Sequence, residues 1–165
     1  MQGVEGERGD DDDHDIRPMS PIGSHHAACV NRLVALLTQH FGRRAIISAQ
    51  NPVRLSDDTE PQPDITVLRP RDDFYAGALP RGCDVLRVVE VADTSLGFDR
   101  EVKLPHDAAS GIAEAWLVDL NHDVIERHTR PMHHGRYAEV VTLQRGETLH
   151  APTLDLSVRV EEIIG

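Results

Sequence analysis

The sequence predicts an α/β or α+β fold in which helices flank a mixed β-sheet and further antiparallel strands follow on the C-terminal side. Residues 85–92 are the most strongly β-patterned run of the chain, and their nearly continuous apolar character is typical of a central strand covered on both faces. Residues 25–41 carry apolar side chains at helical spacing, and several short strand-like runs follow residue 115. This order of elements supports the fold class.

The first predicted helix covers residues 25–41, with Ser24 as a candidate N-cap. His26 lies four residues before Val30 and therefore shares the apolar face of this helix. It is either a core histidine or a contributor to an adjacent site. The apolar face is formed by Val30, Leu33, Val34, Leu37 and Phe41.

The remaining elements alternate with loops that are rich in proline, glycine and charge. A second helix is predicted over residues 99–110, and it ends at Gly111, a residue type favoured just after a helix C-terminus. Loops are predicted at 56–63 and 70–83. Strands are predicted at 44–49 with an extension over 51–55, and at 64–68, 85–92, 115–119, 124–129, 137–143 and 156–160.

The 165 residues are enough for one domain, predicted over residues 19–165. Residues 1–18 form an acidic segment that is predicted to be disordered, and residues 19–23 are predicted to turn into the first helix. No apolar run approaches a membrane span of about 20 residues, so we expect a soluble, cytoplasmic protein. Cys29 and Cys83 form no CxxC pair and are predicted to be plain thiols, while His133 and His134 fall in a surface turn.

The formal net charge is −11, of which residues 1–23 contribute −5, from two arginines and seven carboxylates. This balance argues against a broad electrostatic grip on nucleic acid.

Glu90 is the most informative residue of the predicted central strand. Side chains alternate along a strand, so Leu86, Val88, Glu90 and Ala92 are predicted to share one face. An ionised carboxylate on an apolar face costs several kcal/mol unless it is paired or binds a metal. Arg87 points to the opposite face, so the partner of Glu90 must come from elsewhere in the fold.

Asp64 is a candidate neighbour, because it follows Pro63 at the opening of its own strand. Two carboxylates from adjacent strands could hold Mg²⁺ or Mn²⁺, which prefer oxygen ligands. The alternative is a buried ion pair. Periodicity alone does not show whether the two strands are neighbours.

Lys103 is the only lysine of the chain. Asp99, Lys103 and Asp107 are spaced by four residues and fall on one helix face. The face is either a solvated surface with an ion pair, or it directs Lys103 toward the two carboxylates, where an ammonium group could stabilise charge on a phosphate.

These motifs carry a resemblance to a known family. The segments EPQPDITVL, VVEVADTS, FDREVK and SGIAEAWLVD resemble, in this order, the Uma-two family, bacterial proteins of the PD-(D/E)XK restriction-endonuclease-like superfamily. The likeness also covers MSPIGSHHA at the first helix and the ending GETLHAPTLDLSVRVEEII, so it spans residues 19–165.

The resemblance implies a restriction-endonuclease-like fold and metal-dependent hydrolysis of DNA phosphodiester bonds. It places Asp64 at the aspartate of the PD motif and Glu90 at the acidic residue of (D/E)XK. Ala92 stands where that motif has lysine, and Lys103 matches the position to which this family moves it. His26 and Asp99 match positions that the family fills with the same residue types.

The site expected from the residues and the resemblance together is a metal-dependent one. Asp64, Glu90 and the Val91 carbonyl would hold Mg²⁺ or Mn²⁺, Lys103 would stabilise the transition state, and His26 and Asp99 would support the site. Pro105 departs from the pattern and predicts a helix that begins later or is kinked. Nucleases of this kind commonly act as dimers, so we expect a homodimer. The alternative is a catalytically weak or silent relative that binds protein or nucleic acid.

Overall fold

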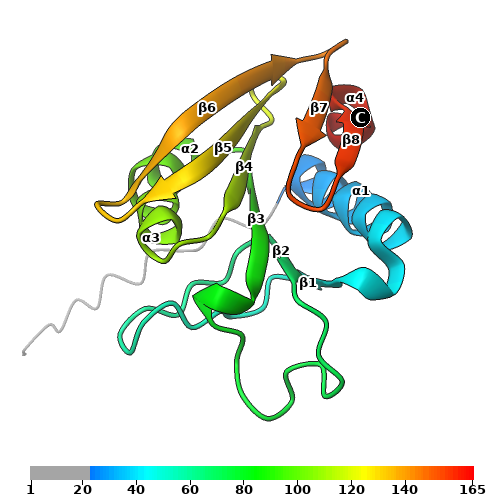
Figure 1. Cartoon of the computed structure of the whole chain (residues 1–165). Helices are drawn as coiled ribbons and strands as arrows, with labels where there is room; N and C mark the ends of the chain where they lie inside the picture. The colour runs from blue at the N-terminus through cyan, green and yellow to red at the C-terminus, as the bar shows by residue number, and fades with distance from the viewer. Residues whose placement is uncertain (1–22) are drawn as a thin grey trace, which may run out of the picture.

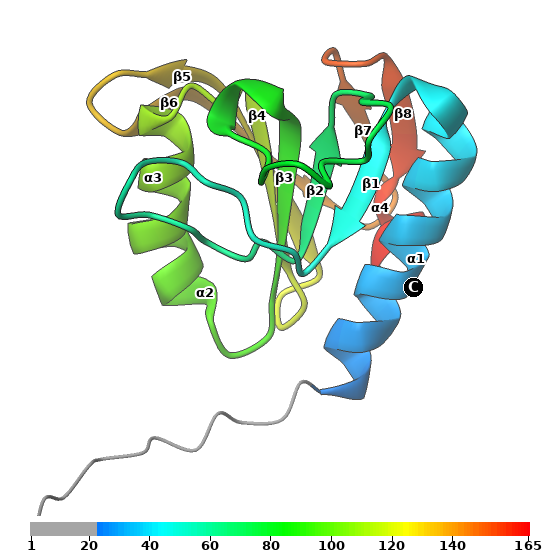
Figure 2. The ribbon, with the colours of Figure 1, turned by 90° about the horizontal axis from the view of Figure 1, so that it is seen from below.

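The computed structural model describes residues 23–165, in which helices pack on both sides of a central sheet (Figures 1 and 2). The long helix α1 (Ser24–Phe41) lies on one side of the sheet and the helical segment ending in α3 (Leu104–Ala109) lies on the other. The predicted α/β or α+β class with a mixed sheet is therefore confirmed. No helix among residues 23–165 is long and apolar enough to span a membrane.

The main sheet has six strands in the order β1-β2-β3-β4-β5-β6. Neighbouring strands run antiparallel except β3 and β4, which are parallel and are joined by the helical segment 96–109. A parallel pair needs such a crossover connection. The strands are β1 (Ile46–Ala49), β2 (Ile65–Leu68), β3 (Val85–Ala92), β4 (Glu114–Asp119), β5 (Val124–Met132) and β6 (Arg136–Gln144).

A small second sheet closes the α1 side of the molecule. It consists of β7 (Thr148–Ala151) and β8 (Leu156–Arg159), and helix α4 (Val160–Ile164) follows directly. The main hydrophobic core lies between α1, this small sheet, α4 and one face of the main sheet. Single 3₁₀ turns precede β1 and β3, at η1 (Gly42–Arg44) and η2 (Gly82–Asp84).

The helical segment between β3 and β4 shows how the chain accommodates Pro105. It runs as α2 (Leu96–Phe98), a π-helical turn η3 (Asp99–Lys103) and then α3, with Pro105 in the first turn of α3. Proline has no backbone N–H and crowds the preceding turn, and the wider π turn precedes it directly. The segment thus begins earlier than predicted, at Leu96, and it stays continuous. It ends before Gly111, whose φ is +76°.

Several predicted boundaries were wrong. Helix α1 already includes Ser24, and Gly23 holds the cap position with its carbonyl bonded to the N–H of Ala27, so Ser24 is not the N-cap. Residues 51–55 do not extend β1, because Arg54 makes only a single bridge to Arg81. The predicted last strand ends at Arg159, and β7 and α4 were not predicted. The predicted disordered segment 1–18 and most of the turn 19–23 lie outside the described residues.

Strand β3 presents its two faces differently along its length. Val88 and Ala92 face the α3 side, while Val89 and Val91 pack in the core beneath α1. The β2–β3 register shifts between Val67 and Leu68, so a bulge lies at the start of β3. Leu86 consequently packs toward the α1 core and does not share the face of Val88, as alternation predicted.

The core also contains a buried charge pair. Arg87 and Glu114 have no exposed side-chain surface and lie 3.3 Å apart, from Nη2 to Oε2. The Arg87 guanidinium lies over the ring of Trp116, at 4.4 Å from its centroid, and donates to the carbonyl of Thr153. Burial lowers the pKa of Arg87, and Glu114 opposes this shift. The pair links the central strands to the β7–β8 turn, and Arg87 is therefore unavailable to Glu90.

Candidate active site

The two predicted acidic residues lie side by side at the end of the β2–β3 ladder. Ile65 pairs with Val89 in antiparallel register, so Asp64, the residue before β2, is placed next to Glu90 on the neighbouring strand. The Glu90 side chain lies on the α3 side of β3, where it contacts Lys103, whereas the Asp64 carboxylate lies at the end of the sheet and contacts Val91 and His26. The structure therefore supplies the adjacency that periodicity could not show.

The backbone of Val91 completes this part of the site. Its N–H donates to Asp64 Oδ2 at 2.8 Å, which fixes the Asp64 carboxylate at the edge of the sheet. Continuing the β2–β3 register places Pro63 opposite Val91. Proline has no N–H, so the ladder offers no donor to the Val91 carbonyl at this point. This carbonyl and the two carboxylates are three oxygen groups at one location.

His26 reaches the same carboxylate from α1. Its Nε2 lies 3.2 Å from Asp64 Oδ1, and both side chains are largely buried. Nδ1 of His26 has no hydrogen-bond partner among the described residues. His26 therefore holds the Asp64 carboxylate from helix α1.

Glu90 is buried, with 1% of its surface exposed, and it lies on the α3 side of β3. Burial raises its pKa well above the ordinary range, because an ionised carboxylate loses hydration there. The nearby Lys103 opposes this shift, while the charges of Asp64 and Asp99 add to it. The carboxylate thus depends on local positive charge to stay ionised.

Lys103 supplies positive charge from the π-helical turn. Its Nζ lies 3.1 Å from Glu90 Oε2 and 2.8 Å from Asp99 Oδ1. Burial alone would lower the pKa of Lys103, but Glu90 and Asp99 together raise it above its ordinary value. Asp99 is itself held by Ser95, whose hydroxyl donates to Oδ2 at 2.6 Å. The ammonium group is therefore charged and fixed between two carboxylates.

Asp107 adds a third buried carboxylate to the same helix face, one turn beyond Lys103. Only 3% of its surface is exposed, and its Oδ2 has no hydrogen-bond partner among the described residues. Burial raises its pKa to about 7, and Lys103 only partly offsets the shift. Three buried carboxylates thus share one lysine. Such an excess of buried negative charge is costly unless protons or a further cation balance it.

Replacement of Asp107 by Asn is expected to stabilise the metal-free protein in a pH-dependent way. In the unfolded chain this carboxyl ionises near pH 3.8, and in the fold near pH 7, so folding becomes less favourable as pH rises through this window. The Asn variant removes this cost, at most about 4 kcal/mol. Urea unfolding in EDTA should show a large gain over wild type at pH 8 and none at pH 4. An equal gain at both values would contradict the assignment, and Glu101→Gln, at an exposed position in η3, is the control.

A pocket of about 410 Å³ opens onto three of these groups, whereas Asp64 and Asp99 do not line it. Glu90, Lys103 and Asp107 line one side, and Phe98 and Val102 form an exposed apolar rim. The opposite wall is the loop of residues 58–62, which reaches across to α3 in Figure 2. The sequence identified this segment only as a polar loop. Its place above the site follows from the β1–β2 connection, which periodicity does not reveal.

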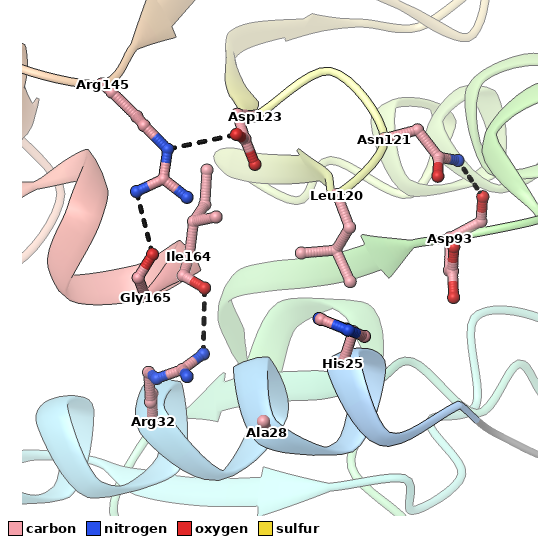
Figure 3. A pocket seen from close by; sticks show the side chains of 10 residues that line it. All are labelled: His25, Ala28, Arg32, Asp93, Leu120, Asn121, Asp123, Arg145, Ile164 and Gly165. Atoms are coloured by element: carbon pink, nitrogen blue, oxygen red, sulfur yellow. Dashed lines mark hydrogen bonds and ion pairs between the residues drawn. The ribbon is translucent and has the colours of Figure 1, made fainter.

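A second pocket, of about 490 Å³, lies on the α1 side and contains none of the predicted site residues (Figure 3). Both of its arginines are bonded to the protein. Arg32 donates to the carbonyl of Ile164, and Arg145 contacts Asp123 and the Gly165 carbonyl. These contacts anchor α4 and the β4–β5 turn, so they have a structural role.

The residues present fit an oxygen-ligated divalent cation. No cluster of three or more His, Cys, Asp or Glu side chains with the geometry of a metal site occurs among residues 23–165. Mg²⁺, however, is commonly bound through one or two carboxylates and completes its shell with water and substrate phosphate. Asp64, Glu90 and the Val91 carbonyl match such a set, and the excess of buried negative charge favours a cation. Burial raises the pKa of the Cys29 thiol to about 12, so this thiol is not a ready source of a thiolate ligand.

The chain resembles known proteins both in sequence and in fold. Residues 5–161 match the model of the Uma2 family, described as "Putative restriction endonuclease". The fold is similar to the crystal structure of a putative nuclease belonging to DUF820 from Anabaena variabilis, with a TM-score of 0.69 and 16% sequence identity over 89% of this chain and 83% of that chain. No curated protein matches the sequence significantly. Because the family match covers nearly the whole chain, the protein belongs to the Uma2 family.

Proposed function

We propose that this protein is a metal-dependent nuclease that hydrolyses DNA phosphodiester bonds at the site of Asp64, Glu90 and Lys103. The observation that carries the proposal is the position of Lys103, whose ammonium lies between the buried carboxylates of Glu90 and Asp99. A buried pair of carboxylates next to a fixed ammonium group is better explained by phosphoryl-transfer chemistry than by a purely structural ion pair.

In this proposal Asp64, Glu90 and the Val91 carbonyl hold one Mg²⁺ or Mn²⁺. The bound ion would polarise the scissile phosphate and lower the pKa of a coordinated water. His26 and the Val91 N–H orient Asp64 by occupying its two oxygens on the protein side. Asp99 does the same for Lys103, so each group that acts is held by a second one.

Lys103 would stabilise negative charge on the phosphate. Its ammonium has three donors, of which Glu90 and Asp99 account for two, and the side chain lines the pocket. The third donor is therefore available to a phosphate oxygen that enters between α3 and the loop 58–62. Charge stabilisation by a fixed donor in a partly buried site is usually a large contribution to catalysis.

Membership of the Uma2 family supports DNA as the substrate. We further propose that the protein acts in the cytoplasm and as a homodimer, the arrangement common among restriction-like nucleases. Light scattering coupled to size-exclusion chromatography measures the second point, and a monomer that cleaves DNA would contradict it.

DNA cleavage tests the proposed function. Purified protein should cleave supercoiled plasmid or single-stranded DNA with Mg²⁺ or Mn²⁺, and EDTA should abolish the cleavage. A wild-type protein that leaves both substrates intact in either metal would contradict nuclease activity. The alternative would then hold, in which the protein keeps the family fold, is catalytically silent and binds protein or nucleic acid.

Lys103→Met is expected to reduce the cleavage rate by about 10²- to 10³-fold, the usual cost of losing a donor that stabilises transition-state charge. The same substitution removes the single lysine that balances three buried carboxylates, so thermal unfolding should be measured in parallel. Adding Asp107→Asn to this variant should restore thermal stability without restoring cleavage. Recovery of both would show that the lysine acts only through folding.

A further inference from the structure

The acidic composition raises the question of where nucleic acid could contact this protein outside the catalytic pocket. The β5–β6 hairpin offers a local answer. Residues 129–138, TRPMHHGRYA, contain two arginines and two histidines and no acidic residue. Arg130, His133, His134 and Arg136 are all exposed. We call this group, residues 130–136, the hairpin tip.

The positive charges of the hairpin tip have no partner within the part of the chain that the structure describes. Arg130 and Arg136 make no ion pair and no side-chain hydrogen bond with any other residue of 23–165. Most other arginines are engaged: Arg54 with Glu60, Arg71 with Asp73, and Arg100 with Glu126. Two guanidinium groups on one hairpin, neither with a partner among residues 23–165, favour an external anion, and a guanidinium suits phosphate in particular.

The hairpin tip packs against the helical segment 96–109, which carries Lys103. Figures 1 and 2 both show the end of the hairpin beside α3. At Gly135, where φ is +85°, a Cβ atom would lie 3.2 Å from the carbonyl oxygen of Pro105, so the backbones approach closely. The hydroxyl of Tyr137 donates to the carbonyl of Ile112, just after α3, at 2.9 Å. The tip therefore holds a fixed position relative to the site.

We propose that the hairpin tip binds the phosphate backbone of the nucleic acid whose scissile phosphate lies at Lys103. The inference rests on the proposed function for the identity of the partner, and it adds the surface that grips it. Arg130 and Arg136 contact phosphate oxygens, and His133 and His134 can donate further hydrogen bonds. These contacts position the nucleic-acid strand and carry no information about its base sequence. An acidic protein thus binds nucleic acid through one local cluster of positive charge.

The test is DNA binding in EDTA, which removes any dependence on metal or on cleavage. Fluorescence anisotropy with a labelled DNA duplex should show that the double variant Arg130→Gln/Arg136→Gln binds about 10-fold more weakly than wild type at low salt. The slope of log K against log salt should become shallower by about 1.8, or 0.9 for each lost phosphate contact. The matched control is Arg43→Gln, at an exposed arginine in η1 after helix α1, which should bind like wild type.

Several outcomes would overturn the inference: no binding by wild type, unchanged binding by the double variant, or an equal loss in the Arg43 control. Competition by polyglutamate as effective as that by DNA would point to an acidic protein partner instead.

A failure of the catalytic proposal can be told apart from a failure of this inference. Glu90→Gln should retain DNA binding in EDTA, so loss of cleavage with intact binding distinguishes the two. Thermal unfolding of each variant verifies that the fold is intact.

Discussion

Replacement of Glu90 by Gln is expected to reduce DNA cleavage with Mn²⁺ by about 10³-fold or more. A carboxylate ligand and its metal contribute several kcal/mol of charge stabilisation in the transition state, and each 1.36 kcal/mol corresponds to a factor of ten. The amide keeps the size and shape of the side chain but not its charge. Initial rates on a labelled DNA substrate give the ratio directly.

The fold should survive this substitution. Glu90 is buried and its pKa is raised by burial, so its ionised form is costly in the metal-free protein. Lys103 retains Asp99 at 2.8 Å as a partner. We therefore expect an unfolding free energy at pH 8 equal to that of wild type or higher. Glu101→Gln is the matched control for cleavage, because Glu101 is exposed in the same helical segment. Wild-type rates in Glu90→Gln would remove Glu90 from the catalytic site.

Replacement of Glu114 by Ala is expected to destabilise the protein by about 3–5 kcal/mol. The change leaves the guanidinium of Arg87 without its carboxylate in a location with no solvent exposure. It also removes the acceptor for the indole N–H of Trp116, which donates to Glu114 Oε1 at 2.6 Å. Urea unfolding at neutral pH measures the loss.

A double-mutant cycle separates the pair from its surroundings. Because an unpaired buried charge is costlier than no charge, the double variant Arg87→Met/Glu114→Gln should lose much less stability than the sum of the losses in its two single variants. The side-chain oxygen of Gln at position 114 can still accept the hydrogen bond from the indole N–H of Trp116. Losses that simply add in the double variant, or a loss below 1 kcal/mol in Glu114→Ala, would show that the two charges do not interact.

The sequence predicted the fold class and most strands, because strong β-patterning and helical spacing are local properties. Prediction from the sequence failed where tertiary contacts determine the local structure. Strand β7 and helix α4 are short and obtain their stability from packing against α1. The reversal of Leu86 depends on a bulge against β2, which alternation within one strand does not reveal.

The candidate site shows the same division. Glu90 was predictable as a site residue, because a carboxylate on an apolar strand needs a partner. The i, i+4 spacing identified Asp99 and Lys103 as neighbours. That Asp64 lies beside Glu90 depends on β2–β3 pairing, which only the fold provides. The burial of Asp107 and the loop 58–62 over the pocket were not predictable from spacing. The Arg87–Glu114 pair was also missed, since the two residues lie 27 positions apart on neighbouring strands.

The most direct test is a calorimetric titration of the protein with Mn²⁺. We predict that wild type and Glu101→Gln each bind one ion in the absence of DNA, and that Asp64→Asn and Glu90→Gln both lose this binding while remaining folded. Mn²⁺ binding that is unchanged in both carboxylate variants would contradict a catalytic cation held by Asp64 and Glu90.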